Sequence, residues 1–143
     1  MDPCSNYLRW SSDNGGLAVA GEDSTIKIYK VAGPTDFKSA FQQVVKFEGG
    51  HFAPVNCVDI SPSKTMVVSS GNDCQACVWD LRTKKLAKKL TFRDKSFRDM
   101  RGQADPTNFT IRGCLFSVCG RYVYLLASKI RYKTFIVQYG ADF

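Results

Sequence analysis

The chain has 143 residues and a formal net charge of +7, and 44% of its residues are hydrophobic. This length is enough to bury the core of an ordinary domain, and no run approaches the ~18 apolar residues of a membrane helix. Met1-Asp2-Pro3-Cys4 lacks the basic start and apolar stretch of a signal peptide. Composition therefore predicts a soluble, intracellular globular chain.

The predicted elements in chain order are short strands separated by turns. Tyr7 to Trp10 form the first strand. Residues 17–29 then repeat the pattern of residues 67–79 at an offset of 50, so that Tyr29 corresponds to Trp79. This repeat predicts at least two copies of one structural unit.

Residues 50–80 carry the clearest pattern. Strands are predicted over 55–60, 66–70 and 75–81, because apolar residues alternate or cluster there between turns rich in Gly, Pro, Ser and Asn. Residues 86–92 are rich in lysine and predict a fourth, outer strand with one exposed face. Gly50-His51 opens the segment and Trp79-Asp80 closes it. That layout is typical of a WD repeat, the four-stranded unit from which β-propeller blades are built.

A third unit is predicted from residues 113–124 and 134–139. The fold prediction is therefore an all-β propeller fragment with about three four-stranded antiparallel blades. The predicted boundaries are a blade over 4–48, a blade over 49–92, a basic loop over 93–109 and a blade over 110–143. Because known propellers use roughly four to eight blades, three cannot close the ring.

An open arc of three blades leaves one blade face uncovered at each end. We expect apolar residues on both faces, and they are Leu17, Val19, Ile26 and Ile28 at one end and Val123, Leu125, Phe135 and Val137 at the other. Uncovered faces of this kind exceed the apolar patches that a monomer usually tolerates.

His51, Ser69 and Asp73 are the residue types of a catalytic triad. A nucleophilic serine needs exposure beside an oxyanion pocket, and the sequence has no Gly-x-Ser-x-Gly elbow. We predict instead a buried hydrogen-bond network that runs from Trp79 through His51 and Ser69 to Asp73. The first unit has Val19 at the position that corresponds to Ser69. A structural network can vary in this way between repeats, whereas a catalytic set could not, so a structural role is favoured. No catalytic residue is assigned.

Cys74-x-x-Cys77 has a spacing that metal and redox sites use. The sequence has no second pair, and its only histidine is assigned to the network, so we predict no metal. The cysteines within apolar strands, such as Cys57 and Cys114, are expected to pack as small hydrophobic side chains. A P-loop and a dinucleotide glycine pattern are also absent, so no cofactor is predicted and the expected function is binding.

The positive charge is concentrated between Arg82 and Arg101, where nine basic and two acidic residues account for the whole excess of +7. Such a segment attracts phosphates, anionic lipid headgroups or an acidic protein surface. The plainer alternative is a solvated outer strand and loop. The segment lacks the aromatic spacing of single-stranded nucleic-acid grooves. The candidate contact residues are Lys84, Lys85, Lys88, Lys89, Arg93, Lys95, Arg98 and Arg101.

The order of motifs resembles the prolactin regulatory element-binding protein family. The resemblance rests on residues 17–31, on Phe47-Glu48-Gly49-Gly50-His51, on residues 70–79 and on residues 108–116 with their Arg112-Gly113-Cys114-x-Phe116 ending. It extends over essentially the whole chain. The outer strand over 85–92, followed by a polar loop and this ending, is not a spacing that WD repeats share in general.

The resemblance implies a guanine-nucleotide exchange factor. Members of that family are propellers on the cytosolic face of the endoplasmic reticulum, held by a membrane helix. They load GTP onto the small GTPase that starts COPII coat assembly, and other coat or scaffold proteins are further candidate partners. The family's cation-holding exchange loop and its membrane helix have no counterpart in this sequence, so we expect the chain to supply scaffold and part of the partner surface.

Two alternatives to the exchange factor stay open. One is a non-enzymatic WD-repeat scaffold for protein complexes. The other, which ranks lower because nucleic acid is the less favoured partner, is a DNA-binding transcriptional regulator that acts through the Arg82 to Arg101 segment.

Overall fold

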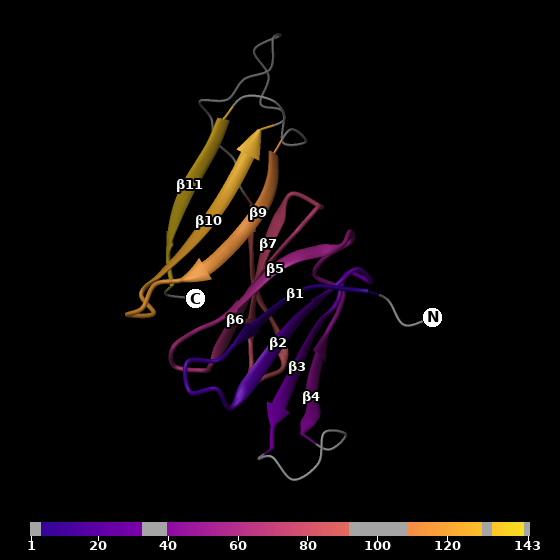
Figure 1. Cartoon of the computed structure of the whole chain (residues 1–143). Coiled ribbons are helices and arrows are strands. Elements are labelled where there is room, and N and C mark those ends of the chain that lie inside the picture. Colours follow the sequence, from indigo (N-terminus) through magenta and orange to yellow (C-terminus); the bar gives the residue numbers. More distant parts are fainter. Residues whose placement is uncertain (1–3, 33–39, 92–108, 130–132, 142–143) are drawn as a thin grey trace.

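The computed structural model describes residues 4–32, 40–91, 109–129 and 133–141. In these ranges eleven strands form three antiparallel sheets (Figure 1). The described residues include no helix long and apolar enough to cross a membrane. The prediction of an all-β chain of WD-repeat blades is confirmed, and the three sheets do not close into a ring within these ranges.

Each sheet is a meander in which neighbours in sequence are neighbours in space. The first sheet has the order β1 (Ser5–Trp10), β2 (Gly16–Gly21), β3 (Ile26–Val31) and β4 (Phe41–Phe47). The second has the order β5 (Val55–Ile60), β6 (Met66–Gly71), β7 (Gln75–Asp80) and β8 (Lys85–Thr91). The third contains β9 (Phe109–Phe116), β10 (Tyr122–Lys129) and β11 (Lys133–Gly140), which gives it three strands in the described residues.

The same turn closes the first hairpin of every sheet. A serine follows the first strand, and its carbonyl accepts from the N–H three residues on. These bonds are Asn14 to Ser11 at 2.9 Å, Lys64 to Ser61 at 2.8 Å and Gly120 to Ser117 at 2.9 Å. The serine Oγ also accepts from the N–H five residues on, namely Gly16 at 2.9 Å, Met66 at 3.0 Å and Tyr122 at 3.0 Å. The hydroxyl thus fixes the start of the second strand in all three sheets.

The second sheet is buried on both faces, because it lies between the other two (Figure 1). The core shared with the first sheet consists of Ala18, Ala20, Ile26, Ile28 and Phe47 against Val55, Val58, Ile60, Val67, Cys77 and Trp79. The core shared with the third consists of Cys57, Val68, Ala76, Val78 and Leu90 against Ile111, Cys114, Phe116, Val123 and Leu125. Successive residues of a strand point to opposite faces, which explains why β6 and β7 are apolar without alternation.

The expected composition of the two uncovered faces is wrong for five of its eight members. Ile26, Ile28, Val123 and Leu125 are buried against the second sheet. Val137 also packs against the core between the second and third sheets. Leu17 and Val19 are partly exposed on the far side of the first sheet, and the side chain of Phe135 lies outside the described part. The strand period of two explains the error: Ala18 and Ala20 face inward, so their neighbours face outward.

Other residues than the predicted ones form most of the outward-facing surface of the two outer sheets. On the first sheet β1 contributes Leu8 and Trp10, which pair with Val19 and Leu17 of β2. On the third sheet Leu115, Leu126 and Ile136 are exposed, and Ile136 retains 76% of its accessible surface. Each outer sheet therefore presents an apolar surface on the side away from the second sheet.

Candidate functional site

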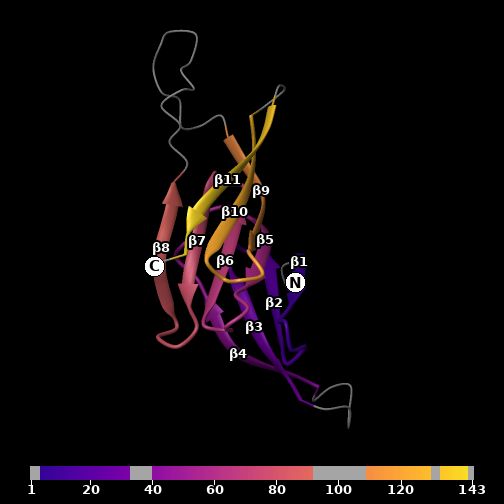
Figure 2. The ribbon, with the colours of Figure 1, turned by 90° about the vertical axis from the view of Figure 1, so that its left-hand side faces the viewer.

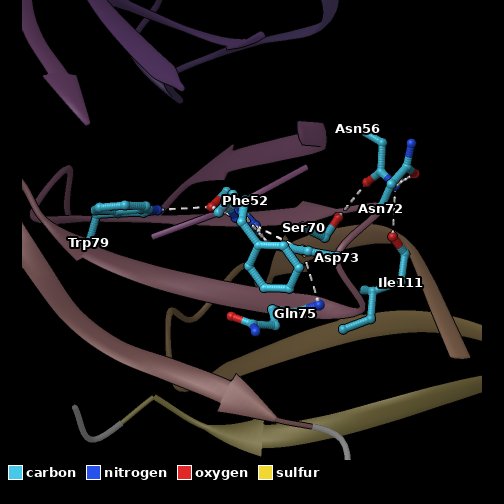
Figure 3. Close-up of polar contacts among 10 residues, drawn as sticks. Phe52, Asn56, Ser70, Asn72, Asp73, Gln75, Trp79 and Ile111 are labelled. Atoms are coloured by element: carbon cyan, nitrogen blue, oxygen red, sulfur yellow. Dashed lines mark hydrogen bonds and ion pairs between the residues drawn. The ribbon is translucent and has the colours of Figure 1, made fainter. Parts of the chain in front are cut away.

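The four predicted network residues come from different elements of the second sheet. His51 precedes β5, Ser69 lies on β6, Asp73 lies in the turn between β6 and β7, and Trp79 lies on β7. Trp79 Nε1 lies 2.8 Å from Ser69 Oγ, Ser69 Oγ lies 2.8 Å from His51 Nε2, and His51 Nδ1 lies 2.9 Å from Asp73 Oδ2. We call these four residues the buried network. Figure 3 shows its two ends, at the Trp79 indole and at Asp73.

The order of the hydrogen bonds differs from the predicted one. The sequence-based order placed His51 next to Trp79, whereas Ser69 occupies that position. The chemistry of the groups explains this order. The indole N–H only donates, and a hydroxyl both accepts and donates, so Ser69 accepts from Trp79 and donates to His51 Nε2. His51 Nδ1–H then donates to the Asp73 carboxylate.

These contacts reproduce the Ser–His–Asp order of a hydrolase triad, but the serine is sealed off. Ser69 has no accessible surface and Trp79 retains 2%, and the side chains of His51 and Asp73 are fully buried. The indole N–H occupies an acceptor position of the Ser69 oxygen that a nucleophile needs free. The arrangement can tie strands together but gives a substrate no access to the serine.

Asp73 also organises the chain around it. Its carboxylate accepts from the N–H of Phe52 and of Gln75, each at 3.2 Å, in addition to His51 (Figure 3). Burial raises the pKa of Asp73, but the hydrogen bond and the charge attraction of His51, together with the two N–H groups, outweigh burial and lower it overall. The carboxylate is thus held ionised inside the fold.

The first sheet keeps the turn and lacks the network. Asp23 corresponds to Asp73, and its Oδ1 accepts from Thr25 N at 3.2 Å and from Thr25 Oγ1 at 2.7 Å. Val19 and Tyr29 stand where the second sheet has Ser69 and Trp79, so no chain of hydrogen bonds forms there.

Trp79 joins the buried network to the boundary between sheets. Its ring stacks on Phe47 of β4 with centroids 4.9 Å apart. A Cβ at Gly50 would collide with the indole ring, which explains why glycine precedes His51. The tryptophan therefore stabilises both the second sheet and its contact with the first.

Two further sets of residues that connect the sheets were missed in the sequence. Asn6 Nδ2 donates to Val55 O at 3.1 Å. Asn56 Nδ2 likewise donates to Ile111 O at 2.9 Å (Figure 3), so an asparagine of the first strand reaches the next sheet in both cases. Asp59 is 6% exposed and accepts from Arg9 Nε at 3.1 Å and from Phe116 N at 2.7 Å, which joins all three sheets.

Signals for both sets were present in the sequence. Asn6 and Asn56 lie at the repeat offset of 50, as do Arg9 and Asp59. A carboxylate between Val58 and Ile60 in an apolar strand indicates a paired, buried charge.

The basic candidates divide into two groups. Lys84, Lys85, Lys88 and Lys89 are exposed on β8 and the turn before it. Figure 2 shows β8 at the edge of the second sheet farthest from β5. Lys84 and Lys85 also border a hollow of about 310 Å³ between β4 and β8, together with Lys46. Arg93, Lys95, Arg98 and Arg101 lie outside the described residues.

The two cysteines of the Cys74-x-x-Cys77 spacing lie in different surroundings. Cys74 is partly exposed in the turn after Asp73, whereas Cys77 is buried in the core, where burial raises its pKa to about 12. Within the described ranges no group of three or more His, Cys, Asp or Glu side chains could hold a metal ion.

Meandering sheets packed face to face, with the Trp–Ser–His–Asp network inside one of them, define the blades of a β-propeller. A family profile described as "WD domain, G-beta repeat" matches residues 4–30 and 41–80, which lie in the first and second sheets. The chain belongs to the WD-repeat family.

Curated relatives show how widely this family is used. The chain is 30% identical over 107 residues, covering 64% of the chain, to "Pre-rRNA-processing protein IPI3" of Mycosarcoma maydis. It is 30% identical over 102 residues, covering 71% of the chain, to a component of chromatin assembly factor 1 of Gallus gallus. It is 35% identical over 80 residues, covering 55% of the chain, to "Protein TOPLESS-RELATED PROTEIN 2" of Oryza sativa subsp. japonica. The matched parts are 18%, 18% and 6% of these relatives, so the chain spans less than a fifth of each.

Proposed function

We propose that the chain works by binding other proteins and not by making or breaking covalent bonds. The observation that carries this proposal is the complete burial of the only Ser–His–Asp set, with the Trp79 indole bonded to the serine oxygen. The relatives are named for pre-rRNA processing, for chromatin assembly and for their relation to Topless. A fold that serves such different processes suits an interaction platform.

The partner that we propose is the small GTPase that starts COPII coat assembly on the cytosolic face of the endoplasmic reticulum. The support is the resemblance carried by residues 17–31, 47–51, 70–79 and 108–116. An exchange factor binds the nucleotide-free GTPase more tightly than the nucleotide-bound form, and the same coupling free energy weakens nucleotide binding. A platform of packed sheets suits this role, because a preformed surface loses little entropy on binding.

The contact surface that we propose is the basic edge, defined as Lys84, Lys85, Lys88 and Lys89. These side chains project from the outermost strand of the second sheet and the turn before it, where a partner can approach without disturbing the core. Four positive charges on one strand and its preceding turn favour an acidic protein surface and speed association with it. DNA is the second candidate, because the same charges attract phosphate.

Binding to the immobilised chain tests the partner. We expect the nucleotide-free GTPase to bind at least tenfold more tightly than its GDP or GTP form. Lys84→Glu/Lys85→Glu should weaken that binding at least tenfold. Lys30→Glu/Arg121→Glu is the matched control, because it makes the same charge change at exposed positions away from β8 and should leave binding unchanged. Equal binding of all three nucleotide states would contradict the exchange-factor proposal and leave the scaffold.

The isolated chain should bind without accelerating nucleotide release, because the resemblance places the family's exchange loop outside it. Fluorescent GDP release at increasing chain concentration measures this, and a rate that rises with the chain would show that the loop is misplaced. Preferential binding of duplex DNA, with an affinity that falls steeply with salt and with Lys84→Glu/Lys85→Glu, would favour the regulator instead.

A further inference from the structure

Two cysteines meet at the boundary between the second and third sheets. Cys57 of β5 and Cys114 of β9 are free thiols and retain only 7% and 5% of their accessible surface. Cys57 Sγ lies 3.5 Å from both the backbone O and the backbone N of Cys114, which accept from and donate to it respectively. The sulfur of one residue thus rests on the main chain of the other.

The side chains of Cys57 and Cys114 also interact with each other. Cys114 Sγ donates to Val68 O over 3.6 Å, a weak bond that a turn about the Cys114 Cα–Cβ bond would break. Cys57 Sγ already contacts the Cys114 backbone, so breaking this bond frees the second sulfur beside the first residue. A disulfide needs Cα atoms about 4.4–6.8 Å apart, so it forms only between residues on adjacent segments, and Cys57 and Cys114 are in direct contact.

A small molecule can reach this pair in spite of its low exposure. Cys57 and Cys114 both line a cavity of about 520 Å³ beside the first strands of the three sheets. Arg9 and Arg112 also line it, and because Arg9 is paired with Asp59, Arg112 supplies the positive charge of the wall. Glutathione disulfide carries several carboxylates, which the Arg112 charge attracts. Cys77, in contrast, is buried and is not part of the lining.

The two thiols are suited to different roles. The interaction with the Cys114 side chain and the hydrogen bond from the Cys114 N–H lower the pKa of Cys57 despite burial and the nearby Asp59. Burial raises the pKa of Cys114, and its contact with Cys57 raises it further. Cys57 therefore loses its proton more readily than Cys114, and the thiolate is the attacking species in disulfide exchange.

We propose that Cys57 and Cys114 are a redox pair that closes into a disulfide between the second and third sheets on exchange with a low-molecular-weight disulfide such as glutathione disulfide. The Cys57 thiolate attacks one sulfur of the oxidant, the oxidant's S–S bond breaks, and one glutathione thiolate leaves. The Cys114 thiol gives its proton to that thiolate and attacks the Cys57 sulfur, which releases the second glutathione. Two protein thiols are oxidised, one small disulfide is reduced to two thiols, and the new bond ties the two sheets together.

Peptide mass spectrometry of the whole chain tests the pair. The chain is incubated with glutathione disulfide, alkylated and digested without reductant, in the wild type and in a Cys4→Ser/Cys74→Ser/Cys119→Ser background that leaves Cys57, Cys77 and Cys114. We expect a peptide containing Cys57 linked to one containing Cys114, lost on reduction, and a melting temperature several degrees higher in the oxidised chain. In that background Cys114→Ser should trap glutathione on Cys57, and Cys57→Ser should slow modification of Cys114 at least tenfold.

Three outcomes would overturn the proposal. The first is stable glutathione on Cys57 of the wild type without a link to Cys114. The second is modification of Cys77 as fast as that of Cys57, since it would show general unfolding rather than a reactive site. The third is a link that joins labelled to unlabelled chains when ¹⁵N-labelled and unlabelled protein are mixed, because the pair would then connect two molecules.

Discussion

Trp79→Ala is expected to destabilise the chain by roughly 3–5 kcal/mol. The indole retains only 2% of its surface, so its removal leaves a large cavity between β4 and β7, where it stacks on Phe47. It also removes the donor to Ser69 Oγ. Urea denaturation followed by far-UV circular dichroism, which does not depend on tryptophan, measures the loss.

Two further variants show whether the loss of stability comes from the buried Trp79 side chain. Ser69→Ala keeps the packing and interrupts the buried network, so it should cost about 1–3 kcal/mol. Trp10→Ala is the matched control, because Trp10 retains 44% of its surface on the far side of the first sheet and should cost far less. A Trp79→Ala loss no larger than that of Trp10→Ala would mean that the indole does not stabilise the second sheet.

Self-association of the purified chain is the second large effect that we expect. Leu8 and Trp10 on the first sheet and Leu115, Leu126 and Ile136 on the third are 39–76% exposed and have no sheet over them in the described structure. Apolar surface of this extent is rare on monomers. Sedimentation velocity should show dimers or larger species, and a hydrophobic dye should bind at neutral pH.

Replacing residues on one face should reverse the association. Leu126→Lys/Ile136→Lys places two charges on the third sheet and should shift the chain toward monomer. Phe52→Lys/Val118→Lys is the matched control, since both residues are highly exposed but lie outside the strands. A wild-type chain that sediments as a monodisperse, dye-silent monomer would contradict this account of the two outer faces.

Prediction from the sequence worked best for strand ends and turns, which depend only on neighbouring residues. The strand over 55–60 was predicted at its observed limits. Pro62 fixes its own φ and has no N–H to donate, and the serines beside it favour a turn, so the strand ends there. The serines at 11, 61 and 117 act in the same local way, through one hydroxyl and one following N–H, yet the unequal spacing of the three units hid their equivalence.

The sequence was least informative where the outcome depends on register. Membership of the buried network could be proposed from spacing, but the order Trp79–Ser69–His51–Asp73 depends on which atoms the pairing of Ser69 with Cys77 brings together. The prediction of the outward-facing residues was wrong for a related reason. Where both neighbours of an apolar residue are apolar, as in β2, the period of two does not tell which set faces the core.

A fluorophosphonate, a probe that labels activated serines, distinguishes a structural Ser69 from a catalytic one. We expect His51, Ser69 and Asp73 to hold the second sheet together and the chain to act by binding. The account predicts no label on Ser69 of the folded chain under conditions that fully label a known serine hydrolase. Stoichiometric labelling of Ser69, abolished by His51→Gln with the fold intact, would contradict it.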